Sequence, residues 1–141
     1  MFFLYFIFQG QFPQLSQVDL VPTFSLLLGL PIPFSNLGSV IVDLFNHCPW
    51  WQTDVNPERQ LFHGIEALHL NAHQVHDYLE AYSAISSEFP RHEHAQLAAL
   101  FKSTEAEVQS LMAALHHGHD AHNVHARLKK LHENYRRYLT G

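Results

Sequence analysis

The stretch VDLVPTFSLLLGLPIPFSNLG, residues 18–38, decides how the first third of this chain folds. It contains three prolines, two glycines and one acidic residue, and most of its other positions are apolar. Neither a regular helix nor a regular strand tolerates that mixture along its whole length. The stretch therefore predicts a short apolar helix followed by a stiff, non-repetitive segment.

Punctuating residues set the limits of this helix. Asp19 precedes the apolar spacing and can cap a helix N-terminus, a role that we favour over that of a catalytic carboxylate. Pro22 falls in the first turn, where a missing N–H costs nothing. Gly29 is placed to end the helix in the left-handed region, and Pro31 and Pro33 prevent its continuation. The segment 36–38 then predicts a turn into a second short helix over about 39–45.

Beyond a loop at 46–57, apolar residues recur every three or four positions. This spacing predicts three helices over about 58–87, 92–115 and 121–139. Their apolar stripes comprise Leu61, Ile65, Leu68, Ala72, Val75, Leu79 and Tyr82, then Leu97, Leu100, Thr104, Val108, Leu111 and Leu115, and finally Val124, Leu128, Leu131, Tyr135 and Tyr138. Short connections make consecutive helices antiparallel neighbours, so a mainly α fold with an antiparallel three-helix bundle is expected.

The first residues do not fit a helical protein. FFLYFIF, residues 2–8, is too short to span a bilayer and lacks the features of a signal peptide. Its aromatic and β-branched content suits a buried strand, and one strand does not make a sheet. We therefore expect the chain to begin partway through a domain.

The composition restricts the classes of function that the chain can have. A net charge of -5 argues against a nucleic-acid-binding surface over the whole chain. The one cysteine, Cys48, excludes an intrachain disulfide. Five basic residues lie close to the C-terminus, and a solvated helix face is favoured over contact with anionic lipid headgroups. They are Arg127, Lys129, Lys130, Arg136 and Arg137.

Thirteen histidines are the compositional peculiarity of the chain. His69, His73 and His76 lie at i, i+4 and i+7 on one face of the first long helix, a spacing that can bind zinc or nickel. A second group surrounds the predicted turn near 118 and comprises His116, His117, His119, Asp120, His122 and His125. Spacing alone is a weak signal for a metal site, so exposed helical and turn positions are the favoured interpretation.

Other catalytic patterns are missing from the sequence. Ser35 and Ser39 lack the G-x-S-x-G surroundings of a hydrolase nucleophile. His47 is adjacent to Cys48, and sequence neighbours seldom form a nucleophile–base pair, so a buried or idle thiol is favoured. The residues by themselves thus indicate a fold and no catalytic, cofactor-binding or metal site.

Two patches carry a resemblance to a known family. QVDLVPTFSLLLGLPIPFSNLGSVI, residues 17–41, resembles the D-L-x-P-T…L-L-G-x-P-x-P element of the alkaline phosphatase superfamily, and in its fuller form that of the GPI ethanolamine phosphate transferases. ALHLNAHQVHDYLEAYSA, residues 67–84, is similar to an N-x-x-Q-V-x-x-Y/F-L helix that follows in those enzymes. Together these patches extend the resemblance over about residues 12–115.

The resemblance implies an enzyme of the endoplasmic reticulum membrane. A lumenal, alkaline-phosphatase-like α/β domain would transfer phosphoethanolamine from phosphatidylethanolamine to a mannose of the GPI-anchor precursor. A threonine nucleophile and two zinc ions held by Asp and His would perform the reaction. The family's D-H-G segment does not occur in this chain, and Thr23 belongs to the helix motif.

The same resemblance implies how the chain is organised. Residues 1–50 would be the tail of the catalytic domain, and residues 51–141 a helical connector toward a membrane domain. We expect a fragment or short isoform that is inactive alone, has no cofactor of its own, and has the rest of the transferase or its membrane domain as partner. Two other interpretations remain: a stand-alone helical interaction module and a histidine-based metal-binding protein.

Overall fold

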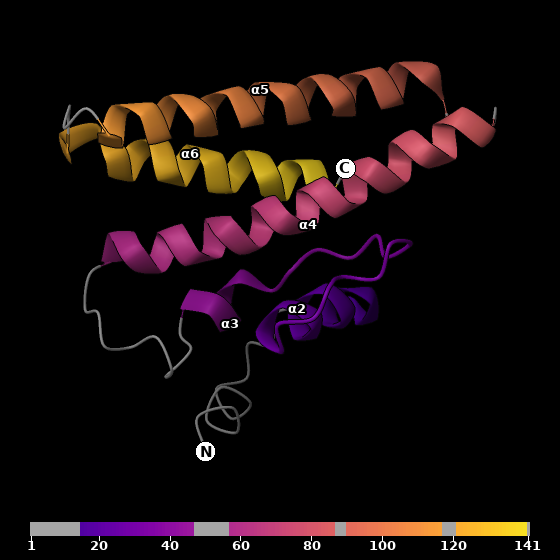
Figure 1. Ribbon diagram of the computed structural model, residues 1–141, viewed down its shortest axis with the longest axis horizontal. Coiled ribbons are helices and arrows are strands. Elements are labelled where there is room, and N and C mark those ends of the chain that lie inside the picture. The colour runs from indigo at the N-terminus through magenta and orange to yellow at the C-terminus, as the bar shows by residue number, and fades with distance from the viewer. Residues whose placement is uncertain (1–14, 47–56, 87–89, 117–120, 141) are drawn as a thin grey trace.

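The computed structural model describes residues 15–46, 57–86, 90–116 and 121–140 (Figure 1). This described part of the chain is mainly helical, as the sequence predicts, and it contains no strand. No helix within it is both long enough and apolar enough to cross a membrane. The predicted strand at 2–8, Cys48, and most of the loop at 46–57 and of the histidine-rich turn lie outside the described residues.

Three long helices form the bundle: α4 (Pro57–Ile85), α5 (Arg91–His116) and α6 (Ala121–Thr140). Figure 1 shows that each helix runs opposite to the one before it, and that α6 lies between α4 and α5. The contacts agree, because α6 touches both of the others far more than α4 and α5 touch one another. The helices thus lie where the sequence predicts, and the bundle is centred on α6.

The predicted stripes supply the core of this bundle. Of those stripes, the buried members are Ile65, Leu68, Ala72, Val75, Thr104, Leu111, Val124, Leu128, Leu131, Tyr135 and Tyr138. Phe101 is also buried, although the stripe predicted for its helix leaves it out. Tyr82 is an exception, because it is 39% exposed near the end of α4.

The basic residues of α6 are consistent with a solvated helix face. Lys129, Lys130, Arg136 and Arg137 are exposed. Arg127 instead binds α5, where its Nε donates to Glu107 Oε1 at 2.8 Å and its Nη2 to Ser110 Oγ at 2.9 Å. One of the five basic residues therefore joins two helices.

The short apolar helix predicted from the opening stretch is α2 (Leu20–Leu27), which follows a single 3-10 turn, η1 (Gln17–Asp19). Gly29 ends it with φ at 68°, in the left-handed region that favours glycine. The Gly29 amide donates to the Leu26 carbonyl at 3.1 Å, and the Leu30 amide donates to the Ser25 carbonyl at 2.7 Å. This pair of bonds is the Schellman motif, so the predicted helix end is confirmed.

The second short helix, α3 (Val42–Asn46), starts three residues later than predicted. The backbone amides of Ser39, Val40 and Ile41 donate to side chains that lie elsewhere in the chain. Because these amides are bound to side chains, the backbone at 39–41 does not adopt the helical conformation. Helix α3 packs on α4, so α4 lies between α6 and a layer of α2 and α3 (Figure 1).

Candidate functional site

Five polar side chains hold the segment 34–41 between α2 and α4. We call them the polar anchor, and they are Asp19, Thr23, Asn36, Asn71 and Gln74. The first three come from the first motif patch, and the other two are the N and Q of the second patch. The two patches of the sequence are thus the two sides of one hydrogen-bonded arrangement.

Asp19 binds a distant backbone group and makes no cap to its own helix. It occupies the N-cap position of α2, but its side chain makes no cap hydrogen bond there. Its Oδ1 instead accepts from the Ser39 amide at 2.8 Å, and the predicted capping role is therefore wrong. Thr23 contributes beside it, since its hydroxyl donates to the Asp19 carbonyl at 2.6 Å and accepts from the Ile41 amide at 2.9 Å.

Asn71 connects this layer to the bundle from a position in α4 that is wholly buried. Its Oδ1 accepts from the Val40 amide at 2.9 Å, and its Nδ2 donates to the Gly38 carbonyl at 3.1 Å. One amide side chain therefore satisfies a donor and an acceptor of a backbone that has no ladder partner. Each such group would carry a desolvation cost of about 1–3 kcal/mol if it were left unpaired.

Gln74 and Asn36 complete the polar anchor at the turn. Gln74 Nε2 donates to the carbonyls of Phe34 at 2.7 Å and Asn36 at 2.9 Å. Asn36 Oδ1 accepts from the Gly38 amide at 2.9 Å, while its Nδ2 donates to the Val18 carbonyl at 3.3 Å. The polar anchor thus hydrogen-bonds backbone groups, and these bonds account for the spacing of the motif.

Gly38 is required for the close approach within the polar anchor. A Cβ at this position would overlap the Val18 carbonyl group and lie 2.9 Å from the Asp19 amide nitrogen. Both neighbours are backbone atoms, which cannot move aside as a flexible side chain can. The glycine that ends the quoted stretch is therefore required because no side chain fits between the two backbone segments.

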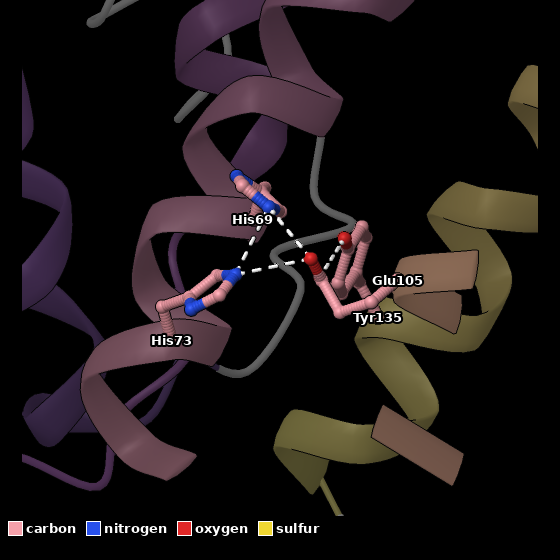
Figure 2. Close-up of polar contacts among 4 residues, drawn as sticks. All are labelled: His69, His73, Glu105 and Tyr135. Atoms are coloured by element: carbon pink, nitrogen blue, oxygen red, sulfur yellow. Dashed lines mark hydrogen bonds and ion pairs between the residues drawn. The ribbon is translucent and has the colours of Figure 1, made fainter. Parts of the chain in front are cut away.

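A second constellation lies inside the bundle (Figure 2). We call it the histidine–glutamate cluster, and it consists of His69 and His73 from α4 and Glu105 from α5. Both Nε2 atoms lie 3.1 Å from Glu105 Oε2, and they are 3.0 Å from one another. Tyr135 from α6 donates its hydroxyl to the other carboxylate oxygen of Glu105 at 2.6 Å. All three helices of the bundle thus meet at this carboxylate.

The surroundings of Glu105 fix its charge. Burial raises the pKa of Glu105, but hydrogen bonds from Tyr135, His73 and His69 outweigh burial, so the net shift is downward. Burial and the hydrogen bond to Glu105 raise the pKa of Tyr135, which keeps its proton. Glu105 is therefore an anion held between two imidazoles and a phenol. The two histidine side chains stay 35% and 45% exposed and can be reached from solvent.

The structure separates the third predicted histidine from the first two. The ring of His76 stacks on Phe101 with centroids 4.1 Å apart, and its Nδ1 lies 3.4 Å from the Tyr138 hydroxyl. In the histidine-rich group, His125 is exposed, and the side chains of the other members lie outside the described set. The spacing therefore identified two of the three clustered residues.

Glu105 and Tyr135 are the residues that sequence reasoning missed at this cluster. They lie 36 and 66 positions beyond His69, and no local motif marks either of them. Tyr135 was expected only as a core residue of its helix. Their meeting with the histidines follows from the register of the three helices, which the apolar stripes constrain too loosely to predict.

Comparisons with known proteins connect the chain to one family. It is similar to the catalytic subunit of GPI ethanolamine phosphate transferase 3 from Homo sapiens, with 44% identity over 96 residues, and from Mus musculus, with 35% identity over 125 residues. These matches cover 68% and 89% of the chain, but only 8% and 11% of the two relatives. GPI ethanolamine phosphate transferase 3 from Schizosaccharomyces pombe is 58% identical over 36 residues, which are 26% of the chain and 4% of that relative. No family model and no solved structure matches.

Among the described residues, one group of three possible metal ligands occurs, which is too few to hold the pair of zinc ions that the resemblance implies. The sequence lacks the D-H-G segment. The hydroxyl of Thr104, beside Glu105, donates to the Leu100 carbonyl within its own helix and is not directed at the cluster. The family's catalytic chemistry is therefore not assigned to these residues. The identities over most of the chain nevertheless confirm the resemblance, and the chain belongs to the GPI ethanolamine phosphate transferase family.

Proposed function

We propose that the chain is a structural segment of a GPI ethanolamine phosphate transferase, in which it joins the end of the catalytic domain to a helical connector. In this proposal the whole transferase moves phosphoethanolamine from phosphatidylethanolamine to a mannose of the GPI precursor, on the lumenal side of the endoplasmic reticulum membrane. The nucleophile and the catalytic zinc ligands are supplied by residues outside this chain. The chain contributes rigidity and a packing surface.

The polar anchor is the observation that carries this proposal. The residues that give the chain its resemblance to the family are used to bind the segment 34–41 to α2 and α4. Side chains that hydrogen-bond a distant backbone segment hold it in a fixed position. A connection between two parts of a larger protein requires such a fixed position. The polar anchor also explains why the resemblance extends from the first patch into α4.

The surface of the α2 layer supports the same role. Val21, Phe24 and Leu28 follow one another at i, i+3 and i+7 and are 41%, 49% and 71% exposed. Leu30, Phe34 and Leu37 follow in the chain, and each is more than half exposed. We call these six residues the apolar face. We propose that the preceding α/β domain of the transferase, which the resemblance identifies with the alkaline phosphatase superfamily, covers it.

The apolar face also suits the second candidate function, that of a stand-alone helical interaction module. In that case a separate protein would cover the same residues. The two functions differ in one requirement. A structural segment must be covalently part of a transferase, whereas a stand-alone module binds a separate protein.

A chimera tests the proposal. The 125-residue segment of the mouse transferase that matches this chain is replaced by the matching residues of the chain, and the chimera is expressed in cells that lack the transferase. We expect GPI-anchored proteins to return to the cell surface, as measured by flow cytometry. The same chimera with Asn71→Ala should fail, and one with His125→Ala should succeed. An abundant, correctly located chimera that restores nothing would contradict the proposal.

A further inference from the structure

The three ligand atoms of the histidine–glutamate cluster converge on a single point. His69 Nε2, His73 Nε2 and Glu105 Oε2 form a nearly equilateral triangle with sides of 3.0, 3.1 and 3.1 Å. From this geometry we propose that the cluster is a binding site for one divalent transition-metal ion, with zinc as the best-fitting ion. This inference does not rest on the proposed function.

Proton accounting supports an ion at this place. If each histidine donates its Nε2 hydrogen to the shared carboxylate oxygen, two N–H groups are left side by side with their nitrogens 3.0 Å apart. If one histidine carries its hydrogen on Nδ1, its Nε2 lone pair faces the carboxylate oxygen at 3.1 Å. Neither arrangement makes all three short contacts attractive. A cation shared by two imidazole lone pairs and a carboxylate oxygen does.

The dimensions fit a tetrahedral ion with little movement. Zinc binds histidine nitrogen and carboxylate oxygen at about 2.0–2.2 Å, which places neighbouring ligands of a tetrahedron roughly 3.4 Å apart. The observed separations of 3.0–3.1 Å therefore need to open by only a few tenths of an ångström. The donors come from i and i+4 of one helix and from a second helix of the bundle, and the two histidines are partly exposed to solvent.

The residues behind the ligands orient them. Tyr135 donates to Glu105 Oε1 and so leaves Oε2 directed at the histidines. The ring of His69 meets that of Tyr135 edge to face at 5.8 Å, and the ring of His73 meets Phe101 in the same manner at 4.9 Å. Hydrogen bonds and packing behind a ligand set its direction and strengthen the site.

The site has an evident structural effect. Helices α4 and α5 share few direct contacts, because α6 lies between them along much of their length. A metal held by two residues of α4 and one of α5 would cross-link that weakly contacting pair. Since an ion that binds only the folded chain stabilises it by mass action, zinc should raise the melting temperature.

Zinc titration of the full chain by calorimetry, with cobalt absorbance as a second readout, tests the proposal. We expect one tightly bound ion per chain and the visible bands of tetrahedral cobalt. His73→Ala removes a ligand and Glu105→Gln removes the negative charge of one, so each should weaken zinc binding by about 100-fold or more, because changes to the residues behind ligands already cost about 10–100-fold. His125→Ala, an exposed histidine of α6, should not change it.

Two further variants keep the test decisive. His117→Ala with His119→Ala removes part of the histidine-rich turn and should leave the tight site intact. Circular dichroism and the melting temperature of each metal-free variant show whether it is folded. If Glu105→Gln does not fold, the conclusion rests on His69→Ala and His73→Ala, whose side chains are partly exposed. Tight binding that survives both histidine substitutions, or only weak binding spread over many histidines, would overturn the proposal.

Discussion

At the residue scale, Gly38 shows how one missing side chain fixes the position of a whole layer. The backbone of Gly38 passes so close to Val18 that a methyl group has no room. In this position the Gly38 amide donates to Asn36, and the Gly38 carbonyl accepts from Asn71. The close backbone approach at Gly38 and the hydrogen bonds of Gly38 therefore depend on one another. A substitution that disturbs either of them should destabilise the packing of this layer.

Substitution of the two glycines of the quoted stretch separates the cost of steric overlap from the cost of a left-handed backbone conformation. Gly38→Ala should lower the free energy of unfolding by about 1–3 kcal/mol or more, because overpacked sites that cannot relax lose that much. Gly29→Ala meets no atom within 4 Å and costs only the left-handed conformation, about 1–2 kcal/mol. Urea denaturation measures both, and a smaller loss for Gly38→Ala than for Gly29→Ala would contradict the close approach described above.

Asn71 offers a second test at this scale. Asn71→Ala leaves the Val40 amide and the Gly38 carbonyl without their partner, so we expect a loss of roughly 2–6 kcal/mol from two buried groups. Asn71→Asp keeps the acceptor, but it places a carboxylate oxygen against the Gly38 carbonyl at a wholly buried position and should not restore the stability. Gln96→Ala, at an exposed position of α5, serves as the control and should stay within about 0.5 kcal/mol of the parent. Equal stability of Asn71→Ala and the control in urea denaturation would refute this role.

At the scale of elements, apolar periodicity was enough to predict the three long helices. A buried stripe and glycine or proline at the ends are local signals, and α4, α5 and α6 carry them. The predicted start of α3 and the predicted cap of Asp19 failed for a common reason. Amides 39–41 and the Asp19 carboxylate bind one another and other distant side chains, and such long-range pairing leaves no periodic trace. The same reasoning explains why His69 and His73 were found from spacing and Glu105 was not.

Helix α6 carries the prediction for pH dependence. Burial and the nearby Arg136 lower the pKa of His132, while Asp43 and Glu133 oppose that shift in part. The unfolded chain, with a histidine pKa of about 6.5, therefore takes up the proton more readily than the folded one. The stability that His132 contributes is present above that pKa and is lost as pH falls through the lower, folded value.

The variant His132→Gln should therefore lose less stability than the parent when pH falls from about 7.5 to about 5.5. Urea denaturation at both pH values provides the measurement. His125→Gln, an exposed histidine of the same helix, should keep the parental pH dependence. An unchanged pH dependence in His132→Gln would contradict the contribution assigned to this residue.

At the scale of the whole molecule, the described chain has two unequal parts that share α4. On one side of α4 the long helices bury a continuous apolar core. On the other side the layer of α2 and α3 depends on the polar anchor and on the packing of α3, and it leaves the apolar face exposed. Soluble monomers seldom expose large contiguous apolar patches, so this face should bind another surface.

The isolated chain is accordingly expected to self-associate or to bind membranes through the apolar face. Phe24→Ser combined with Leu28→Ser removes two large side chains from that face while leaving the polar anchor intact. Sedimentation velocity at increasing concentration should show association for the parent and less for this double variant, and flotation with phospholipid vesicles should show the same order. Ile85→Ser is the matched control, because Ile85 is 90% exposed but lies at the end of α4, outside the apolar face. If exposure alone drove association, Ile85→Ser would reduce it as much as the double variant. A parent chain that stays monomeric and unbound at high concentration would show instead that the apolar face needs no cover.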